Sequence, residues 1–472
     1  MTSPLADPTY RRLFTAQVIA LAGTGLSTVA LALLAYNLAG GDAGIVLGTA
    51  LALKMVAYVC VAPIVGAFAH RLPRRALLIA LDVARAIIVI CIPFVTEVWQ
   101  IYPLIFLLNA CSAGFTPTFQ ATIPDVLPDD ARYTRALSLS RLAYDLENLL
   151  SPLFAAAALL VLSYNALFVM NAVTFVISAA LVLSVQLPSP RLIEREGHGW
   201  SNVIFGARAY LATPRLRGLL ALSFVVAAAG AMVIVNTVVY VRENIGGTES
   251  DTAFAFAAYG AGSIIVALTL PRILDRFPDR PLMLAGAIFS ILGLFLGFFE
   301  PGLHFLLMIW ILLGMGGALI QTPAGRLIKR SAHDADRPSI FAFQFALSHA
   351  CWLITYPLAG WIGGTFSAMA AFLTFGILSM IATAMALILW PADDPMELEH
   401  THEEESHSHR HLHDEHHQHS HQGWEGQEPH THPHTHAPMK HTHVYVIDLH
   451  HPDWPITNSP SGYSMQTGGK SG

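Results

Sequence analysis

The segment His70-Arg71-Leu72-Pro73-Arg74-Arg75 lies between two long apolar runs, and a related segment, Asp275-Arg276-Phe277-Pro278-Asp279-Arg280, follows 205 residues later. At the same offset, Ser151-Pro152-Leu153 corresponds to Tyr356-Pro357-Leu358. Matches at one constant offset indicate an internal duplication. Duplicated membrane units are typical of transporters in which two halves rock about a central site. An enzyme does not need such a duplication.

Apolar runs recur along most of the chain. A transmembrane helix needs about 20 mainly apolar residues, and we predict twelve such spans, at residues 13–38, 44–68, 76–96, 99–118, 137–162, 165–187, 217–241, 251–271, 281–299, 303–325, 340–363 and 367–390. The predicted fold class is an all-α membrane protein of twelve transmembrane helices in two pseudo-symmetric six-helix halves, followed by a disordered tail. The predicted domains are a first half at 1–187, a central cytoplasmic loop at 188–216, a second half at 217–390 and a histidine-rich tail at 391–472.

The composition supports a membrane protein and excludes several other classes. Only 12% of the residues are charged and 54% are apolar, whereas soluble domains carry about 25% charged residues. The four cysteines lie inside apolar runs and form no Cys-x-x-Cys pair, so we expect no disulfide. The chain has no phosphate-binding Gly-x-x-x-x-Gly-Lys-Ser/Thr motif, so we expect no nucleotide partner. Nothing in the charge pattern indicates nucleic-acid binding.

The orientation follows from the basic residues between the predicted spans. They gather in alternate connections, at Arg71, Arg74 and Arg75, at Arg132 and Arg135, within residues 191–217, at Arg272, Arg276 and Arg280, and at Arg326, Lys329, Arg330 and Arg337. Lysine and arginine concentrate in cytoplasmic loops, which makes this side cytoplasmic. An even number of spans then places both termini in the cytoplasm. We expect a multi-pass protein of the bacterial inner membrane whose helices contact the lipid bilayer.

The tail holds eighteen of the twenty-three histidines of the chain, within residues 400–472. Most follow a His-x-His pattern: His400, His402, His407, His409, His411, His413, His416, His417, His419, His421, His430, His432, His434, His436, His441 and His443. Neutral imidazole suits nickel, zinc, cobalt and copper(II). The tail also carries thirteen acidic against three basic residues from Pro391 onward, which attracts cations. We predict metal binding; the alternative is a passive extension or a tag, although tags are usually consecutive histidines.

Ionisable groups at bilayer depth are costly unless paired, so each one is a functional candidate. The predicted fifth span is the richest, with Arg141, Tyr144, Asp145, Glu147 and Asn148 on overlapping helix faces. A divalent cation needs anionic and amide oxygens, and a proton antiporter needs a carboxylate that either the metal or a proton can occupy. The alternative is structural: Arg141 neutralises Asp145, and Glu147 only hydrogen-bonds within the bundle.

Four further residues inside the spans are functional candidates. His349 corresponds to Tyr144 at the 205-residue offset and is a ligand or proton carrier, or else a packing residue. Lys54 lies near the middle of the second span, where it would repel a metal ion but could be the counter-ion of a carboxylate. Asp82 and Arg85 are three residues apart on one helix face, which favours a structural ion pair over a gating role.

The loop after the second span resembles a known family motif. Gly66-Ala67-Phe68-Ala69-His70-Arg71-Leu72-Pro73-Arg74-Arg75 resembles the Gly-x-x-x-Asp-Arg-x-Gly-Arg-Arg/Lys loop of the major facilitator superfamily. More narrowly, residues 51–58, 81–85 and 143–152, together with the tail, resemble bacterial nickel-resistance permeases of the Nre/Nrs kind. The resemblance implies the major facilitator fold and a gating role for Gly66, His70, Arg71, Arg74, Arg75, Asp82, Arg85, Asp275, Arg276 and Arg280.

Two departures from the motif bear on that gate. His70 stands where the superfamily has aspartate, and Pro73 where it has glycine, so the first copy lacks the carboxylate that latches the cytoplasmic gate in the family. The second copy keeps a carboxylate at Asp275. The Gly-Pro motif of family antiporters is reduced to Ser151-Pro152.

The leading functional hypothesis is secondary-active efflux of a divalent metal, nickel first and cobalt next, in exchange for protons and conferring metal resistance. The chain is not expected to be an enzyme, to hold a resident cofactor or to need an obligate protein partner. One alternative is an exporter of an organic compound or metal chelate whose tail senses metal. Another is a membrane protein that buffers metal by sequestration alone.

Overall fold

The computed structural model describes residues 3–39, 43–68, 72–188, 199–333, 336–394, 397–402, 405–411, 430–436, 439–447 and Trp454. The chain divides into two compact units, Met1–Asp394 and Pro395–Gly472. We call the first the membrane body and the second the tail, and each is described by itself. The predicted residues His70, Arg71, His413, His416, His417, His419 and His421 lie outside the described residues.

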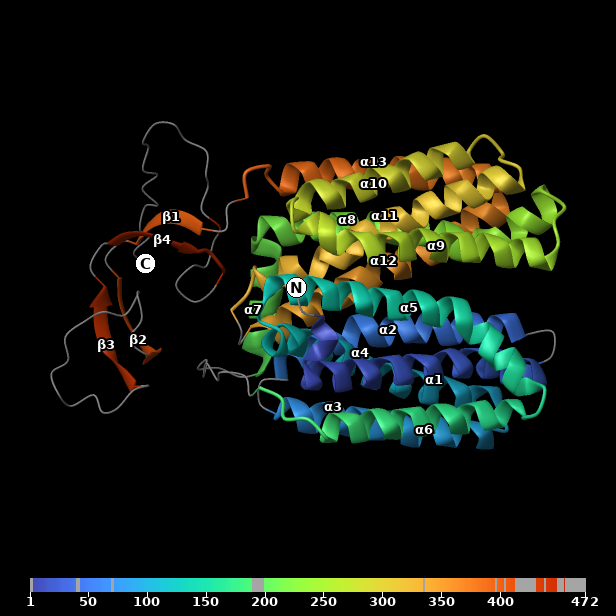
Figure 1. Cartoon of the computed structure of the whole chain (residues 1–472), viewed down its shortest axis with the longest axis horizontal. Helices are drawn as coiled ribbons and strands as arrows, with labels where there is room; N and C mark the ends of the chain where they lie inside the picture. The colour runs from blue at the N-terminus through green and yellow to red at the C-terminus, as the bar shows by residue number, and fades with distance from the viewer. Residues whose placement is uncertain are drawn as a thin grey trace, which may run out of the picture. The chain divides into compact units, whose positions relative to one another are not determined.

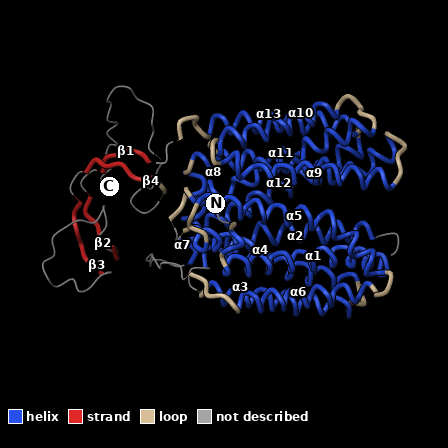
Figure 2. Tube along the Cα trace, viewed as in Figure 1, coloured by secondary structure: helices blue, strands red, loops and turns tan. Residues whose placement is uncertain are grey.

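The described part of the membrane body is helical (Figures 1 and 2). Its long helices are α1 (Pro8–Ala39), α2 (Ala43–Phe68), α3 (Arg74–Cys91), α4 (Val98–Val126), α5 (Asp130–Leu159), α6 (Tyr164–Leu183), α8 (Pro214–Val239), α9 (Glu249–Leu274), α10 (Asp279–Gly297), α11 (Leu303–Lys329), α12 (Arg337–Thr365) and α13 (Ala368–Leu389). Short helical turns cover Pro4–Ala6, Ile92–Phe94 and Tyr240–Asn244. The long connection between α6 and α8 contains a further helix, α7 (Gly199–Ala212), that the sequence analysis does not predict.

Eleven helices in the described residues are long and apolar enough to cross a bilayer, and α5 is the one long helix that is not among them. It carries Arg141, Asp145 and Glu147 within its length. The all-α membrane fold predicted from the apolar runs is therefore confirmed. The helix that departs from the common composition is the one that holds the candidate site.

Each half packs mainly on itself. In the first half α1 and α3 pack against α6, and α2 packs against α4; in the second half α9 and α10 pack against α11, and α8 packs against α13. Phe168 and Phe175 lie in the buried core of the first half. Trp310 and Phe372 lie in that of the second. The halves meet chiefly along two seams, α2 with α12 and α5 with α9, and α4 also contacts α12 and α5 also contacts α11.

Glycines at equivalent positions of the two halves allow close helix packing. A Cβ atom at Gly25 in α1 would lie 1.8 Å from the Ser151 Oγ atom of α5, and one at Gly230 in α8 would lie 2.1 Å from the Trp352 ring of α12. Gly25 and Gly230 are separated by the 205-residue offset of the repeat. The duplication seen in the loops therefore extends to the helix contacts beside the candidate site.

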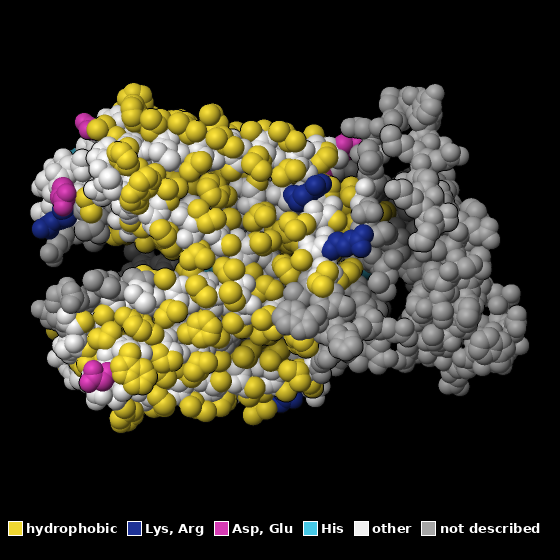
Figure 3. Space-filling model, turned by 180° about the vertical axis from the view of Figure 1, so that it is seen from behind, with side chains coloured by type: hydrophobic (Ala, Val, Ile, Leu, Met, Phe, Trp, Pro, Cys, Tyr) yellow, Lys and Arg dark blue, Asp and Glu magenta, His cyan; other side chains and the backbone are white. Residues whose placement is uncertain are grey.

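The two ends of the membrane body differ. We call the end that carries α7, the start of α3 and the end of α11 the basic end, because Arg74, Lys329 and Arg337 lie there. Figure 3 shows the two halves parted by a hollow at the opposite end. The same view shows a mainly hydrophobic surface along the helices. The exposed large apolar side chains of the body include Ile87 and Ile288. The halves are thus closed on one another toward the basic end and open away from it.

The described part of the tail contains four short strands, where the sequence analysis expects no regular structure. Strand β1 (Glu397–His402) pairs antiparallel with β4 (Met439–Val444), and β2 (Glu405–His411) pairs antiparallel with β3 (His430–His436). The register sets histidines opposite one another: His400 with His441, His407 with His434, His409 with His432, and His411 with His430. His-x-His has the two-residue period of a strand, which explains how this polar pattern also fits an antiparallel ladder.

Candidate functional site

Helix α5 carries the site from the basic end into the middle of the body. It starts after Asp129, whose side chain accepts a hydrogen bond from the Arg132 backbone N–H group (2.8 Å) and so caps the helix. Asp145 lies fifteen residues after Asp130, about 22 Å along the helix at 1.5 Å per residue. An ordinary capped helix therefore positions charged groups at bilayer depth.

Asp145 belongs to a polar network that joins the two halves. Its carboxylate pairs with Arg141 on the same helix (2.9 Å) and accepts a hydrogen bond from the Ser263 hydroxyl of α9. Arg141 also donates to the Ser263 Oγ atom (3.0 Å) and to the Gln321 side-chain oxygen of α11 (3.1 Å). We call Arg141, Asp145, Ser263 and Gln321 the inter-half ring. The ion pair weighed in the sequence analysis forms, but within a network that the sequence did not show.

Glu147 lies two residues beyond Asp145 and has different surroundings. It is half-buried and faces α1, where a Cβ atom at Gly25 would approach its Oε1 atom to 2.9 Å. The positive charge of Lys54 on α2 acts on it. Among the described residues, Glu147 has no cation within ion-pair distance. The Asn148 side chain lies outside the described side chains.

Lys54 and His349 come together across the α2–α12 seam. The Lys54 Nζ atom lies 5.6 Å from the centre of the Tyr58 ring. The Tyr58 ring meets the His349 imidazole edge-on at 4.7 Å between ring centres. His349 packs on the Phe345 ring at 4.2 Å, and its Nδ1 atom lies 2.7 Å from the Phe345 carbonyl oxygen. This contact leaves the Nε2 atom of the imidazole as the atom that could bind a ligand.

Tyr144 links this group to Glu147. Its side chain hydrogen-bonds with that of Gln17 on α1, and its hydroxyl interacts electrostatically with Tyr58 and Glu147. We call Lys54, Tyr58, Tyr144, Glu147 and His349 the central cluster. The structure thus brings together four of the residues proposed from the sequence and separates them from Arg141 and Asp145, which belong to the inter-half ring.

Sequence reasoning missed Tyr58 and Ser263, although the repeat held a signal for both. At the 205-residue offset, Tyr58 corresponds to Ser263, and Lys54 corresponds to Tyr259. The α2–α12 and α5–α9 seams are therefore related by the duplication. In each seam, a polar side chain from one half contacts a candidate residue on the other.

The donor set of the central cluster is small. Among the residues that the structure describes, no group of three or more histidine, cysteine, aspartate or glutamate side chains could hold a metal ion. Glu147 and His349 are the anionic oxygen and neutral nitrogen donors of the cluster. A divalent ion bound here would complete its coordination with water, backbone or neutral side-chain oxygens.

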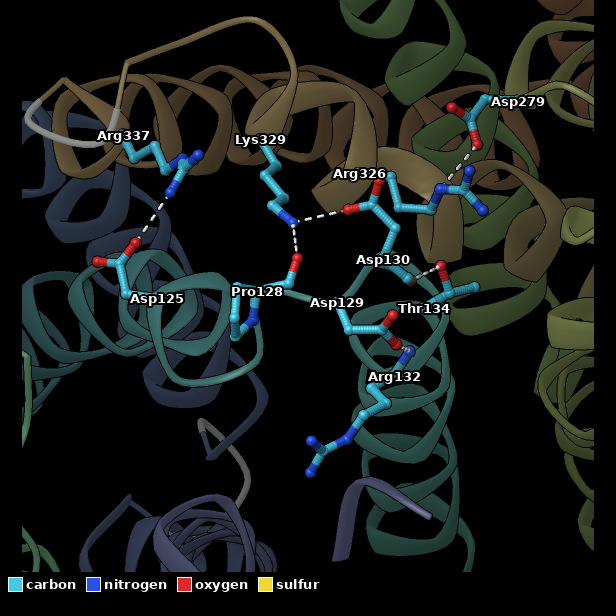
Figure 4. Close-up of polar contacts among 10 residues, drawn as sticks. All are labelled: Asp125, Pro128, Asp129, Asp130, Arg132, Thr134, Asp279, Arg326, Lys329 and Arg337. Atoms are coloured by element: carbon cyan, nitrogen blue, oxygen red, sulfur yellow. Dashed lines mark hydrogen bonds and ion pairs between the residues drawn. The ribbon is translucent and has the colours of Figure 1, made fainter. Parts of the chain in front are cut away.

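The halves are tied together at the basic end by ion pairs (Figure 4). Asp125 at the end of α4 binds Arg337 of α12 at 2.8 Å and also pairs with Arg74 of α3. Lys329 at the end of α11 binds the Asp130 carboxylate (2.7 Å) and the Pro128 carbonyl oxygen (2.9 Å). We call these contacts the basic-end latch.

The second copy of the loop motif, at residues 275–280, is not arranged as the family resemblance predicts. Asp275 and Arg276 are exposed, so Asp275 is not the buried latch carboxylate that the motif suggests. The buried carboxylate of this connection is Asp279, which lies 3.5 Å from Arg326. Arg280 donates to the Trp390 carbonyl oxygen at 2.9 Å. The latch is formed instead by Asp125 at the end of α4 and Asp130 at the start of α5, both in the first half.

The first-half motif residues mainly stabilise their own half. Asp82 and Arg85 form the predicted ion pair, and Ser178 of α6 donates to Asp82 at 2.8 Å. The Arg85 guanidinium lies over the Phe115 and Phe175 rings, 4.2 and 4.4 Å from their centres. Outside that group, Arg75 donates to the Leu183 carbonyl oxygen, and a Cβ atom at Gly66 would lie 2.3 Å from the Ala342 Cβ atom of α12.

The end of the membrane body is held by a second ionic group. Asp394 pairs with Arg330 at the end of α11, lies 3.5 Å from Arg215 of α8, and accepts a hydrogen bond from the Trp390 indole N–H group at 2.8 Å. The chain is therefore anchored to the second half just before the tail begins.

Comparison with proteins of known sequence finds a match at the level of the family and one distant relative. The sequence model of the Major Facilitator Superfamily matches residues 13–228 and 219–427. An uncharacterized MFS-type transporter, YfiS, of Bacillus subtilis (strain 168) is 26% identical over 120 residues, which are 25% of this chain and 28% of that protein. The chain thus matches little more than a quarter of this relative's length.

Comparison with solved structures shows the fold. The human organic anion transporter MFSD10 (TETRAN) is 11% identical with a TM-score of 0.70, over 80% of this chain and 99% of that one. The transporter FucP in the outward conformation is 13% identical with a TM-score of 0.64, over 81% and 99%. A bacterial homologue of the iron transporter ferroportin in the outward-facing state is 12% identical with a TM-score of 0.66, over 81% and 98%.

The separate family matches to residues 13–228 and 219–427 parallel the duplication of the helices, and together they cover most of the chain. Its helical architecture is also shared with solved transporters of this type over most of their length. The chain belongs to the major facilitator superfamily of membrane transporters.

Proposed function

We propose that this transporter exports divalent transition-metal ions, nickel first and cobalt next, in exchange for protons. One observation carries the proposal: a histidine-rich tail follows a body whose helix α5 holds two carboxylates in its middle part, Asp145 and Glu147, two residues apart. Ionisable groups at this depth are expensive and belong to substrate or proton pathways. The imidazoles of the tail bind the same class of ion that the Glu147 carboxylate and the His349 imidazole could bind during transport.

In this mechanism Glu147 and His349 of the central cluster contact the ion. A carboxylate holds either a metal ion or a proton, so loading with one displaces the other. Lys54 acts electrostatically on both Glu147 and His349. Its ammonium charge favours release of the cation once the site has lost access to the cytoplasm.

The orientation completes the proposal. The basic end is assigned to the cytoplasm because lysine and arginine gather in cytoplasmic connections, in a bacterial inner membrane with both termini inside. In this orientation, a closed basic-end latch and a hollow at the opposite end would correspond to an outward-facing conformation (Figure 3). The tail then collects ions on the side from which they are removed, and the ions leave on the other side.

A second candidate is favoured by a specific observation. The described residues offer no group of three metal-binding side chains. They do offer aromatic rings around the centre, including Tyr58 and the Trp352–Tyr356 pair, whose ring centres are 5.0 Å apart. A site that combines rings, an ammonium group and a carboxylate suits an organic molecule or a metal chelate. In that case the tail senses metal rather than delivering it.

Metal uptake into inside-out membrane vesicles with an acidic lumen tests the proposal. Nickel, cobalt and zinc are offered separately to the wild type, to Glu147→Gln, to Asp145→Asn/Glu147→Gln and to a chain ending at Asp394. Ending at Asp394 keeps the anchor to Arg330. The exposed carboxylate variant Glu243→Gln is the matched control.

Gradient-dependent accumulation of nickel that is lost in both Glu147 variants, kept in Glu243→Gln and only weakened by truncation supports metal–proton exchange. Absence of any metal accumulation by correctly folded wild type overturns it. Transport of a nickel chelate without transport of the free ion selects the second candidate.

A further inference from the structure

The histidines of β2 and β3 are paired across the two strands as well as spaced along each of them. Three histidines of β2 stand directly opposite three of β3: His407 with His434, His409 with His432, and His411 with His430. Glu405 stands opposite His436 at one end of the same series. We call these four opposed pairs the histidine ladder.

All members of the histidine ladder belong to one face of the β2–β3 pair. Successive residues of a strand alternate between its two faces, and serine, arginine, threonine and proline occupy the positions between the ladder residues. A shift of the register by one residue would set each histidine opposite one of these residues and divide the histidines between the two faces. The register of β2 and β3 is therefore one that gathers the histidines of both strands on a single face.

The β1–β4 pair shows that His-x-His spacing alone does not produce this arrangement. Both of its strands contain a His-x-His unit. His400 stands opposite His441, but His443 stands opposite Leu398, and His402 stands opposite Met439. The β1–β4 pair thus has one opposed pair of histidines where the β2–β3 pair has three.

Distances favour an ion held between the strands over an ion held along one strand. Directly opposed residues of an antiparallel pair have Cβ atoms about 4.5–5.5 Å apart, whereas residues two apart in one strand are separated by about 6.8 Å. Metal–nitrogen bonds of about 2.0–2.1 Å bring two imidazole nitrogens on one ion to within roughly 3–4 Å of each other. Opposed histidines therefore reach a shared ion with less distortion of the strands than neighbouring histidines of one strand.

Binding of this kind is coupled to the pairing of the strands. An isolated two-stranded pair is marginally stable in water, and pairing β2 with β3 closes the connection of residues 412–429 at a cost in entropy. An ion that is bound by both strands binds the paired form and not the separated strands, so it stabilises the pairing by mass action. Neutral imidazole suits nickel, cobalt, zinc and copper(II), which are the ions that would act in this way.

We propose that the histidine ladder binds divalent transition-metal ions between β2 and β3, with the two histidines of an opposed pair as ligands of the same ion. Water completes the coordination, and at the Glu405–His436 pair a carboxylate takes the place of one imidazole. The β2–β3 part of the tail therefore folds as it takes up metal. The choice of metal rests on the proposed function, whereas the pairing of the ligands rests on the register of the strands.

Two double variants of the full chain distinguish this site from chelation by neighbouring histidines of one strand. His407→Thr/His434→Thr removes one opposed pair and leaves two pairs of histidines, whereas His407→Thr/His432→Thr breaks two pairs and leaves one. Each variant loses one histidine from each strand and keeps the same number of His-x-His units in each strand. Threonine preserves the preference for a strand. The two variants are thus matched in everything except the pairing across the strands.

Nickel binding is measured by titration calorimetry of the full chain in detergent, and backbone hydrogen exchange reports the pairing of the strands. In the wild type, nickel at about 100 times its Kd is expected to slow exchange in β2 and β3 together by about 100-fold. The variant that lacks one pair is expected to keep the protection around His409 and His432 and to bind more nickel than the variant with two broken pairs. The latter is expected to lose the protection in the middle of both strands.

Spin labels test the proximity of the strands directly. Labels at Ser406→Cys and Thr435→Cys occupy opposed positions on the face without histidines, in a chain whose four native cysteines are replaced by serine. Zinc serves as a diamagnetic ion and is expected to broaden the continuous-wave spectrum strongly. Labels at Ser406→Cys and Thr431→Cys, where the second position lies four residues away along β3, are the control and are expected to show weaker broadening.

The outcomes separate this inference from the proposed function. Equal nickel binding and equal protection in the two double variants overturn it, and so does nickel binding that leaves exchange in wild-type β2 and β3 unchanged. A tail that binds neither nickel nor zinc also overturns it. Failure of nickel uptake by vesicles, with the difference between the double variants intact, rejects the metal cargo and leaves the histidine ladder standing.

Discussion

At the scale of the residue, the most constrained charge in the first half is Arg85. Its guanidinium lies between the Phe115 and Phe175 rings and is bound by Asp82, which Ser178 also holds. Asp82 is fully buried. A buried pair contributes little net stability over an apolar replacement, but removal of one partner leaves a charge without compensation. The Asp82–Arg85 pair and Ser178 therefore join α3 to α6, and removal of either charge alone should destabilise the protein.

Asp82→Asn is expected to destabilise the protein strongly, by about 3–5 kcal/mol, because the Arg85 charge stays buried without its anion. The measurement is the thermal unfolding midpoint in detergent, with the exposed Glu243→Gln as control. The double variant Asp82→Asn/Arg85→Met, which removes both charges, is expected to recover much of the loss. A single variant as stable as wild type would contradict the buried-pair account.

The same scale shows what sequence reasoning can reach. Helical spacing alone predicts the Asp82–Arg85 and Arg141–Asp145 pairs, since residues three or four apart share a face. It cannot assign the partner helix, so the hydrogen bond between Ser263 and Asp145 cannot be predicted from the sequence. The separation of Asp145 from Glu147 is likewise a property of the packing, because both lie within one turn of α5.

At the scale of the element, small residues decide how closely helices approach. A Cβ atom at Gly314 in α11 would lie 2.0 Å from the Tyr259 carbonyl oxygen of α9 and 3.1 Å from the Ser263 backbone nitrogen. Small residues at such contacts allow the close helix approach typical of membrane bundles. The same contact therefore sets the position of the Ser263 hydroxyl within the inter-half ring.

Gly314→Ala is expected to destabilise the second half by about 1–3 kcal/mol, since overpacking forces backbone shifts. Gly260→Ala, on α9, is the matched control, because a Cβ atom there would meet nothing within 4 Å. That change is expected to be neutral or to stabilise by about 0.5–1 kcal/mol, as alanine favours a helix over glycine. The measurement is the thermal unfolding midpoint of each variant. Equal midpoints would argue against a close contact between α9 and α11 at Gly314.

Element boundaries show a systematic difference between sequence and structure. Helix α4 continues to Val126 and α5 starts at Asp130, whereas the apolar runs predict residues 99–118 and 137–162. An apolar run marks the part of a helix in lipid, and a helix extends beyond it wherever polar turns find partners. Here those turns carry Asp125 and Asp130, so the predicted spans omit the residues that form the latch.

At the scale of the whole molecule, the conformation depends on contacts spread over the seams between the halves. The inter-half ring lies at mid-depth, and the basic-end latch lies at one surface. The two parts of the latch differ in burial: the Asp125 and Arg337 side chains are 12% and 11% exposed, whereas Asp130 is 71% exposed. Exposed ion pairs contribute about 0–1 kcal/mol and are screened by salt. The Asp125 pair should therefore hold the basic end closed, and the Lys329–Asp130 pair should only assist.

Asp125→Asn is expected to open the basic end, because it removes the anion that both Arg337 and Arg74 bind. Asp130→Asn is expected to change little, since Lys329 keeps its contact with the Pro128 carbonyl oxygen. Spin labels attached at Leu72→Cys and Phe277→Cys, two exposed positions in equivalent loops of the halves, report the opening of the basic end in a chain whose four native cysteines are replaced by serine. The distance between the labels is measured for both variants at low salt and at about 1 M salt, where the screening length falls to about 3 Å. High salt should remove any effect of Asp130→Asn and preserve that of Asp125→Asn. A larger opening for Asp130→Asn than for Asp125→Asn would contradict this account, because it would mean that the exposed Lys329–Asp130 pair holds the basic end closed.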